Sequence, residues 1–152
     1  MQSAVPKGQG GMLAVLGEKI ENINEILYLN KDKFQCFVAN DNSVGQIVVS
    51  GNIKDLYLFS EILKSKNIKN IKLPVSAPFH CELMSKATFH MKDKILNAKF
   101  KKPKNIIISN VTGSETQEID EIKKLLIQQI ESPVRWRESV VYMIKNAVTN
   151  FI

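Results

Sequence analysis

The sequence has few arginines and no long apolar run. Of its 21 basic residues only Arg135 and Arg137 are arginines, and the lysines are scattered, so the formal charge of +6 does not indicate a base-reading surface. No stretch of 18 apolar residues occurs, and the first residues form no basic-then-apolar secretory signal. We therefore expect no nucleic-acid partner, no membrane partner and a cytoplasmic location.

Cysteine and histidine are also scarce, which limits metal and disulfide chemistry. Cys36 and Cys81 form neither a C-x-x-C pair nor a disulfide framework, and two isolated thiols suit a reducing compartment. His80 and His90 lack the spacing of metal ligands. We expect no metal site and no cofactor.

What is present is enough apolar sequence for a core, since 44% of the 152 residues are hydrophobic. The first part reads as strand, helix, two strands joined by a turn, helix and strand. We place the strands at 12–17, 34–39, 46–50 and 68–75, and the helices at 18–29 and from Asn52 or Asp55 to Lys66. This βαββαβ order is typical of a ferredoxin-like fold.

From Ser76 onward longer helices follow strands, a pattern that favours a parallel sheet flanked by helices. We expect helices at 81–97, 118–130 and 133–146, and strands at 105–109 and 148–152. The predicted fold class is therefore α/β, with an α+β small subdomain. The predicted division is a connector at 1–11, a ferredoxin-like subdomain at 12–75 and a partial α/β subdomain at 76–152, with an unpaired sheet edge through which the chain could self-associate.

The segment from Leu73 to Met84 is the best candidate for chemistry. Pro74 and Pro78 restrict this stretch to extended geometry, and they place His80 on a short loop just before a predicted helix. A lone histidine is more often a surface or packing residue than a catalyst. Its position between Pro78 and a helix start favours a role as a base.

Four stretches occur in an order that identifies a family. They are Ala39–Gly51, which reads ANDNSVGQIVVSG, Leu73–Met84, Ser109–Thr112 and Gln129–Trp136. Together they resemble malonyl-CoA:acyl carrier protein transacylase, and the likeness runs over essentially the whole chain. The resemblance implies malonyl transfer from coenzyme A to acyl carrier protein in fatty acid biosynthesis, and a hydrolase-like character for residues 76–152.

The resemblance also implies roles for particular residues. His80 would be the general base, and the backbone carbonyl of Gln129 would orient it. Phe79 would exclude an α-methyl branch and so select malonyl, whereas without the family it reads as a packing anchor. Asn42 would lie near the cleft, although for the hairpin residues a turn role is the simpler interpretation. Asn110, at the end of an apolar strand, could either form a hydrogen bond near the cleft or cap the next turn.

The same comparison shows what these 152 residues do not contain. There is no Gly-x-Ser-x-Gly elbow to supply the serine nucleophile, and the family's carboxylate-binding arginine and oxyanion-hole glutamine would precede Met1. We therefore interpret the chain as a C-terminal portion of the enzyme and expect it to be inactive alone. The sequence does not say whether the other half was lost, removed or supplied by another chain.

Two other interpretations fit the same residues. Cys81, next to His80, could act as the nucleophile of a thiol hydrolase, but adjacent side chains at a helix start point in different directions. Alternatively, the chain is a non-enzymatic ferredoxin-like module that docks an acidic partner through its lysines. A lysine-bearing face would equally steer an acidic acyl carrier protein.

Overall fold

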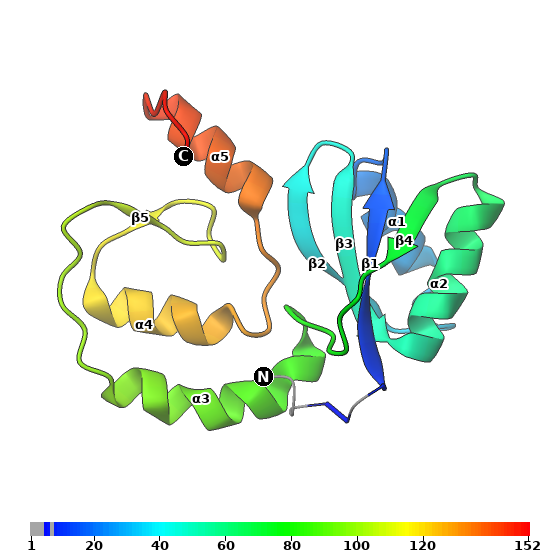
Figure 1. Ribbon diagram of the computed structural model, residues 1–152, viewed down its shortest axis with the longest axis horizontal. Coiled ribbons are helices and arrows are strands. Elements are labelled where there is room, and N and C mark those ends of the chain that lie inside the picture. Colours follow the sequence, from blue (N-terminus) through cyan, green and yellow to red (C-terminus); the bar gives the residue numbers. More distant parts are fainter. Residues whose placement is uncertain (1–4, 7) are drawn as a thin grey trace.

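The structure is a computed structural model that describes residues 5–6 and 8–152 (Figure 1). Its first part contains a four-stranded antiparallel sheet in the order β2-β3-β1-β4, with two helices. This strand order and the βαββαβ succession confirm the ferredoxin-like prediction. The elements are β1 (Gly10–Leu16), α1 (Ile20–Leu29), β2 (Cys36–Ser43), β3 (Gln46–Asn52), α2 (Ile53–Ser65) and β4 (Lys69–Lys72).

The two faces of this sheet bury different residues because side chains alternate along a strand. Leu13 and Val15 of β1 point toward α1 and α2, where they join a core that includes Ile23 and Phe59. Met12, which directly precedes Leu13 and therefore points to the opposite face, belongs to a second cluster with Ala39 and Val48. Since both faces are covered, β1 reads as a nearly continuous apolar run.

The second part consists mainly of three helices. It contains a short 3-10 turn η2 (Glu82–Met84), α3 (Ser85–Asn97), β5 (Ile107–Ile108), β6 (Glu115–Thr116), α4 (Ile119–Gln128) and α5 (Trp136–Lys145). Helices α3 and α4 lie side by side, as Figure 1 shows. A small cluster of Met84, Ala87 and Ile130 holds the start of α3 against the end of α4.

The sheet of the second part differs from the prediction. Strand 105–109 is reduced to Ile107–Ile108, which pairs antiparallel with β6, and residues 148–152 form no strand. The chain reverses at Gly113, whose φ is 66° and whose N–H bonds the carbonyl of Ser109, so a hairpin forms here. A parallel pair would need a crossover connection that leads to another strand beside β5. Within the described residues the sheet of the second part contains only β5 and β6, which are antiparallel.

Other boundaries shift by a few residues. Gly10 and Gly11, expected in a connector, already pair in β1, while residues 1–4 and 7 of that predicted connector lie outside the described residues. Strand β4 ends at Lys72 because Pro74 has no N–H to donate to a ladder. The helix expected from Cys81 begins as a 3-10 turn and becomes α-helical at Ser85.

A second connection ties the two parts together besides the linker from Leu73 to Cys81. Val134 forms a parallel bridge with Asn40 of the edge strand β2. Its N–H donates to Ala39 O at 2.8 Å and its carbonyl accepts from Asp41 N–H at 2.9 Å. The segment before α5 therefore covers part of an edge that would otherwise be open.

Candidate functional site

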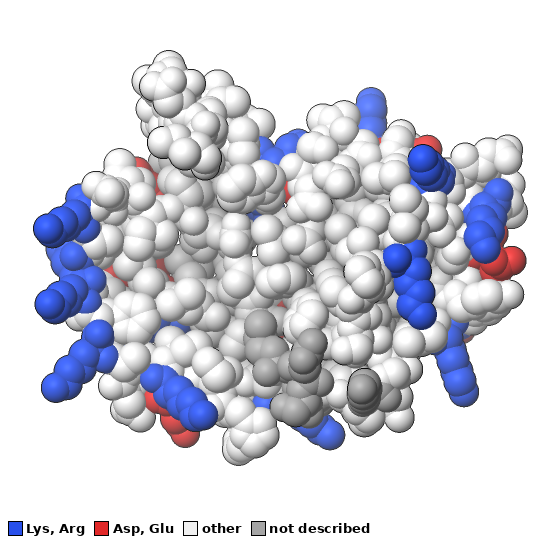
Figure 2. Space-filling model, in the orientation of Figure 1, with Lys and Arg blue, Asp and Glu red and all other residues white. Residues whose placement is uncertain are grey.

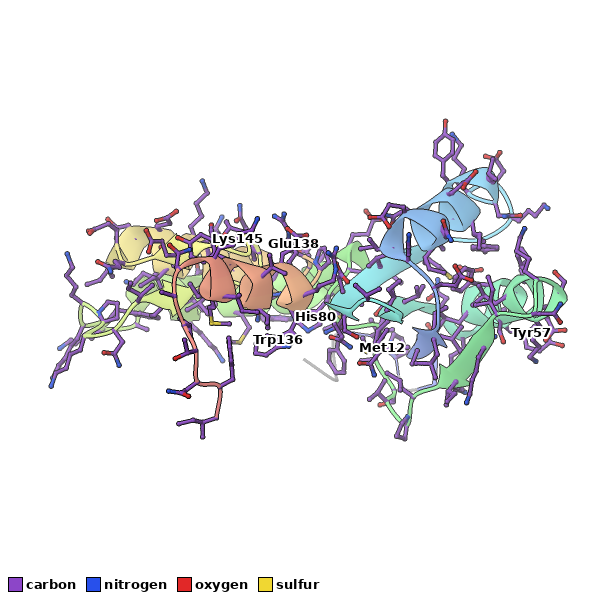
Figure 3. The ribbon with its side chains drawn as sticks, turned by 90° about the horizontal axis from the view of Figure 1, so that it is seen from above. Met12, Tyr57, His80, Trp136, Glu138 and Lys145 are labelled. Carbon is purple, nitrogen blue, oxygen red and sulfur yellow. The ribbon has the colours of Figure 1, made fainter. Side chains whose placement is uncertain are left out.

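His80 lies at the junction between the sheet and the helical part, as Figure 3 shows. Its φ is +59°, in the left-handed region that non-glycine residues adopt only a few per cent of the time. Such a conformation costs about 1–3 kcal/mol and persists only where the surroundings enforce it. The loop around His80 is therefore held by specific contacts.

Three contacts fix the residues just before His80. The hydroxyl of Ser50 in β3, which is fully buried, donates to Phe79 O at 2.6 Å. Pro78 packs directly on Gly10, where an added Cβ would come within 2.2 Å of the proline Cδ. The thiol of Cys81 donates to Pro78 O at 3.1 Å. Contacts with the sheet therefore hold the loop in place.

The imidazole of His80 meets the residue that the resemblance named. Its Nδ1 lies 3.1 Å from the backbone carbonyl oxygen of Gln129, at the end of α4. A carbonyl oxygen can only accept, so this contact requires the proton on Nδ1 and leaves the lone pair on Nε2. With the proton on Nδ1, the Gln129 side-chain Nε2, 3.3 Å away, cannot donate to that ring nitrogen, and it donates to Ser132 O at 3.1 Å.

Phe79 is partly buried and contacts both small clusters of the junction. One is the Met12 cluster under the sheet, and the other is the Met84 cluster at the start of α3. The structure thus shows a packing contact for this side chain. The role of Phe79 in substrate selection stays a prediction.

The two asparagines differ in position. Asn110 and Gln129 line a common hollow of about 140 Å³ between the β5–β6 hairpin and α4, so the structure brings Asn110 close to Gln129. Asn42 instead lies at an irregular position of β2 next to the β2–β3 turn, and within the described residues its side chain forms no hydrogen bond. Its place in the cleft stays a prediction.

The thiols are poorly suited to act as nucleophiles. Burial raises the pKa of Cys81 to about 11, and burial together with nearby Asp55 raises the pKa of Cys36 to about 12. A reactive cysteine needs the opposite shift, because the thiolate is the nucleophile. The Cys81 thiol also donates to a backbone carbonyl rather than to His80.

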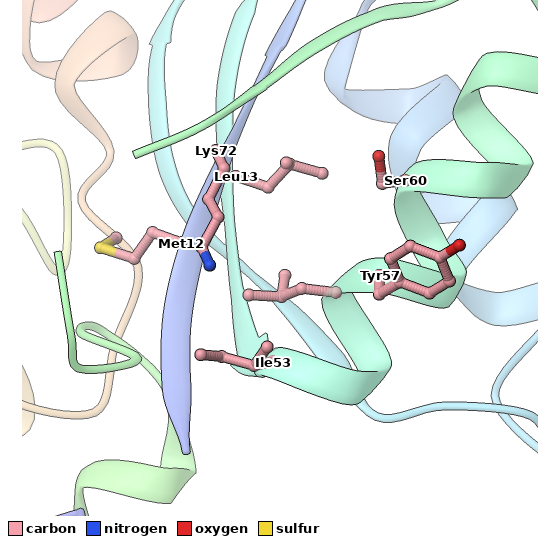
Figure 4. Close-up of a pocket in the computed structure, with 7 residues that line it drawn as sticks. Met12, Leu13, Ile53, Tyr57, Ser60 and Lys72 are labelled. Carbon is pink, nitrogen blue, oxygen red and sulfur yellow. The ribbon is translucent and has the colours of Figure 1, made fainter. Parts of the chain in front are cut away.

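Outside the junction, the described residues offer little that could support chemistry. A hollow between β1, α2 and β4, lined mainly by apolar side chains with Tyr57, Ser60 and Lys72 around it, holds no histidine or carboxylate (Figure 4). Among residues 5–6 and 8–152, no group of three or more His, Cys, Asp or Glu side chains is placed to hold a metal ion. In the same residues no helix is long and apolar enough to cross a membrane.

Charge is distributed unevenly over the surface. Figure 2 shows basic side chains toward both ends of the molecule and few charged groups in the middle of that face. One basic group is the exposed connection between α3 and β5, which carries Lys99, Lys101, Lys102 and Lys104. On the face that Figure 2 shows, the basic side chains therefore form no single patch.

Two contacts of this junction gave no signal in the sequence. Asp41, with its side chain only 4% exposed, pairs with Arg137 at 2.7 Å, although the two residues are 96 positions apart. Ser50 follows three buried apolar residues of β3 and has no local feature that points to the His80 loop. Both depend on how distant segments pack.

The fold and the junction define an α/β protein in which a ferredoxin-like subdomain meets a helical part at a histidine bonded to a backbone carbonyl. No model of a known protein family matches the chain. Malonyl CoA-acyl carrier protein transacylase of Bacillus subtilis (strain 168) is 39% identical, aligned with 100% of this chain and 49% of its own length. The protein of the same name from Haemophilus influenzae is 32% identical over 97% of this chain.

Solved structures that are similar to this chain carry the same kind of name. The crystal structure of malonyl CoA-acyl carrier protein transacylase from Clostridium perfringens has a TM-score of 0.92 at 38% identity, covering 97% of this chain and 47% of that one. A complex of a type II PKS acyl-carrier protein with its malonyl-transacylase contains a chain with a TM-score of 0.91 at 29% identity. This chain is thus homologous over its length to malonyl CoA-acyl carrier protein transacylases, which confirms the resemblance, and it spans about half the length of the curated relatives it matches.

Proposed function

We propose that this chain supplies the general base of a malonyl-CoA:acyl carrier protein transacylase, with a serine nucleophile that lies outside these 152 residues. The observation that carries the proposal is the contact between His80 Nδ1 and Gln129 O, which leaves Nε2 free to accept a proton. The homology to proteins of that name supplies the substrate class.

The chemistry at His80 follows from that geometry. Nε2 takes the proton of the serine hydroxyl while the serine oxygen attacks the thioester carbonyl of malonyl-CoA. The imidazolium so formed keeps its Nδ1–H on Gln129 O, and Nε2 then returns the proton to the departing thiolate of coenzyme A. The carrier's phosphopantetheine thiol reverses these steps, so that the malonyl group leaves the serine as a new thioester.

The first test uses the chain alone with malonyl-CoA and intact-mass spectrometry. Without a nucleophile the rate should fall by roughly 10⁴ to 10⁶, so no stable acyl adduct should appear. Stoichiometric labelling of a serine in this chain would contradict the proposal. Labelling of Cys81 would support the alternative in which this thiol is the nucleophile.

The second test supplies the other half as a separate polypeptide that contains the serine elbow, taken from the Bacillus subtilis relative. Acyl transfer should then appear, and His80→Ala should abolish the gain. His90→Ala is the matched control, because His90 lies on the partly exposed outer side of α3. Full activity in His80→Ala, or equal loss in His90→Ala, would overturn the assignment of the base.

Acyl carrier protein as partner can be tested separately. The acidic carrier should bind through the chain's dispersed lysines, and weak charge docking should disappear as salt rises past the screening range. A titration at increasing salt measures this. Binding that persists at about 0.5 M salt indicates a shaped site rather than charge docking.

A further inference from the structure

We propose that Ser50 is a positioning residue for His80, an inference that rests on the proposed role of His80 as the base. The hydroxyl of Ser50 donates to the carbonyl oxygen of Phe79 at 2.6 Å. That oxygen belongs to the peptide unit whose nitrogen is the N of His80. Because a peptide unit is planar, holding its oxygen also sets the direction in which the His80 backbone continues.

The direction matters because His80 has a positive φ of 59°. The loop carries a residue with a Cβ in a region where such residues are rare, so its conformation depends on outside contacts. Pro78 is fixed by its packing on Gly10, and Phe79 by its side chain in the junction clusters. Among the residues that the structure describes, Ser50 adds the one side-chain hydrogen bond to the peptide unit that leads into His80.

The orientation of the His80 backbone determines whether its imidazole ring reaches Gln129 O. The 3.1 Å distance between Nδ1 and Gln129 O exists only if the His80 backbone and the end of α4 keep their relative positions. Without the Ser50 hydroxyl, the partly buried Phe79 carbonyl loses the hydrogen bond that the described residues give it, and we expect the peptide unit to turn toward another donor. The ring then leaves Gln129 O and is free to adopt the Nε2–H tautomer that neutral histidine favours in water.

A buried serine needs some hydrogen-bond partner in any fold, so the experiment must separate positioning from ordinary burial. Ser139 of α5 is the matched control: it is 2% exposed, and its hydroxyl donates to Arg135 O at 2.9 Å. His90 is the internal reference, as the only other histidine of the chain.

The measurement is the set of imidazole ¹⁵N shifts of the ¹⁵N-labelled chain at a pH where the ring is neutral. In the unaltered chain His80 should show one protonated Nδ1 and one unprotonated Nε2. In Ser50→Ala the two His80 signals should move toward each other as the tautomers mix, while His90 stays unchanged. Ser139→Ala should leave both histidines unchanged.

A folded Ser50→Ala with unaltered His80 signals would overturn the proposal. If Ser50→Ala does not fold, Ser50→Cys, which fills nearly the same space with a weaker donor, should give the same shift in part. Failure of both variants to fold, while Ser139→Ala folds, would assign Ser50 to the core and also overturn it.

This readout needs no acyl transfer, so the two proposals fail separately. Mixed tautomers in Ser50→Ala together with no activity in any assembly would contradict the proposed acyltransferase function and support the positioning role of Ser50. In an active assembly, Ser50→Ala should lower kcat about tenfold or more and leave KM for malonyl-CoA nearly unchanged, because substrate contacts are intact and only the base is misplaced. A rise in KM alone would contradict the proposal.

Discussion

Cys36 and Cys81 lie in apolar surroundings that hold the proton on each thiol. The pKa is raised to about 12 for Cys36 and to about 11 for Cys81, above the value of about 8.5 for an unfolded cysteine. The unfolded chain therefore loses these protons first as pH rises. The stability that the thiols contribute is complete below about pH 8.5 and is lost as pH rises toward 11–12.

A prediction follows for the pH dependence of unfolding. Between about pH 8 and pH 10.5 the free energy of unfolding should fall more steeply in the unaltered chain than in Cys36→Ala/Cys81→Ala. Urea titrations at several pH values measure the difference, and lysine and tyrosine ionisation cancels in the comparison. Parallel curves for the two proteins would show that the thiols ionise alike in the folded and unfolded chain.

Phe79 has two expected effects that one variant can separate. In an assembled enzyme Phe79→Ser should change the ratio of kcat/KM for malonyl and methylmalonyl thioesters by about tenfold, the effect of one methyl group in a fitted pocket. Because the ring packs on two clusters, the same change should lower the free energy of unfolding by about 2 kcal/mol.

The matched control is Phe89→Ser on α3, where the ring is 79% exposed and neither effect is expected. Lost stability in Phe79→Ser with an unchanged selectivity ratio would leave Phe79 as a packing anchor only.

At the scale of elements, the contact between β2 and α5 includes an ion pair in which the Asp41 carboxylate is buried and the Arg137 side chain is 32% exposed. Asp41 accepts from Arg137 Nε at 2.9 Å and 3.1 Å through its two carboxylate oxygens. Arg137→Met would leave the buried carboxylate without its partner and should lower the free energy of unfolding by about 3 kcal/mol. Chemical denaturation measures this loss.

The double variant Asp41→Leu/Arg137→Met should recover most of that stability, since no charge is then left buried. Lys64→Met, which breaks the exposed pair with Glu61, should have no measurable effect. A double variant as unstable as Arg137→Met would show that the pair itself, and not the unpaired charge, carries the energy.

The elements also show how far the sequence could be read. In the first part, alternating and helical apolar patterns predicted each strand and helix to within a few residues, because most of the apolar side chains that make these patterns pack into clusters on the two faces of one sheet. The apolar run within 105–109 predicted a strand of a parallel sheet, yet Ile106 and Ile107 are exposed and only Ile107–Ile108 pair. An apolar run indicates that burial of its side chains is favourable, but it does not indicate which element they pack against.

The contacts of the candidate site also include some that the sequence could predict and some that it could not. His80 and Gln129 could be predicted as a pair because both belong to motifs with a family precedent, and their contact is present. Ser50 and the Asp41–Arg137 pair could not, since each joins segments far apart in sequence and neither has a local signature. Their contacts exist only once the sheet has packed against the linker and α5.

For the whole molecule, apolar exposure in the second part is the notable feature. Leu126 of α4 and Ile107 of β5 are about 40% exposed and line the hollow that also contains Asn110 and Gln129. Further exposed apolar side chains of this part are Phe89, Ile106, Ile144 and Phe151. Exposed apolar surface of this kind marks a place where another chain or segment binds.

We therefore predict that the 17.2 kDa chain self-associates through this surface. Light scattering should give a mass above that of one chain, which falls on dilution. Raising salt should strengthen the association, because it screens the repulsion of a net charge of +6 without weakening apolar contacts.

Leu126→Gln should reduce the association, whereas Leu58→Gln on α2, at a site of nearly the same exposure, should not. These matched variants distinguish a localised apolar contact from general insolubility, which both changes would relieve alike. A monomer that keeps one mass at all concentrations and salt levels would show that the exposed side chains of the second part do not form an interface between copies. The hollow beside Gln129 would then be available to the serine-bearing half alone, and adding that half should bury Leu126 without first having to dissociate an oligomer.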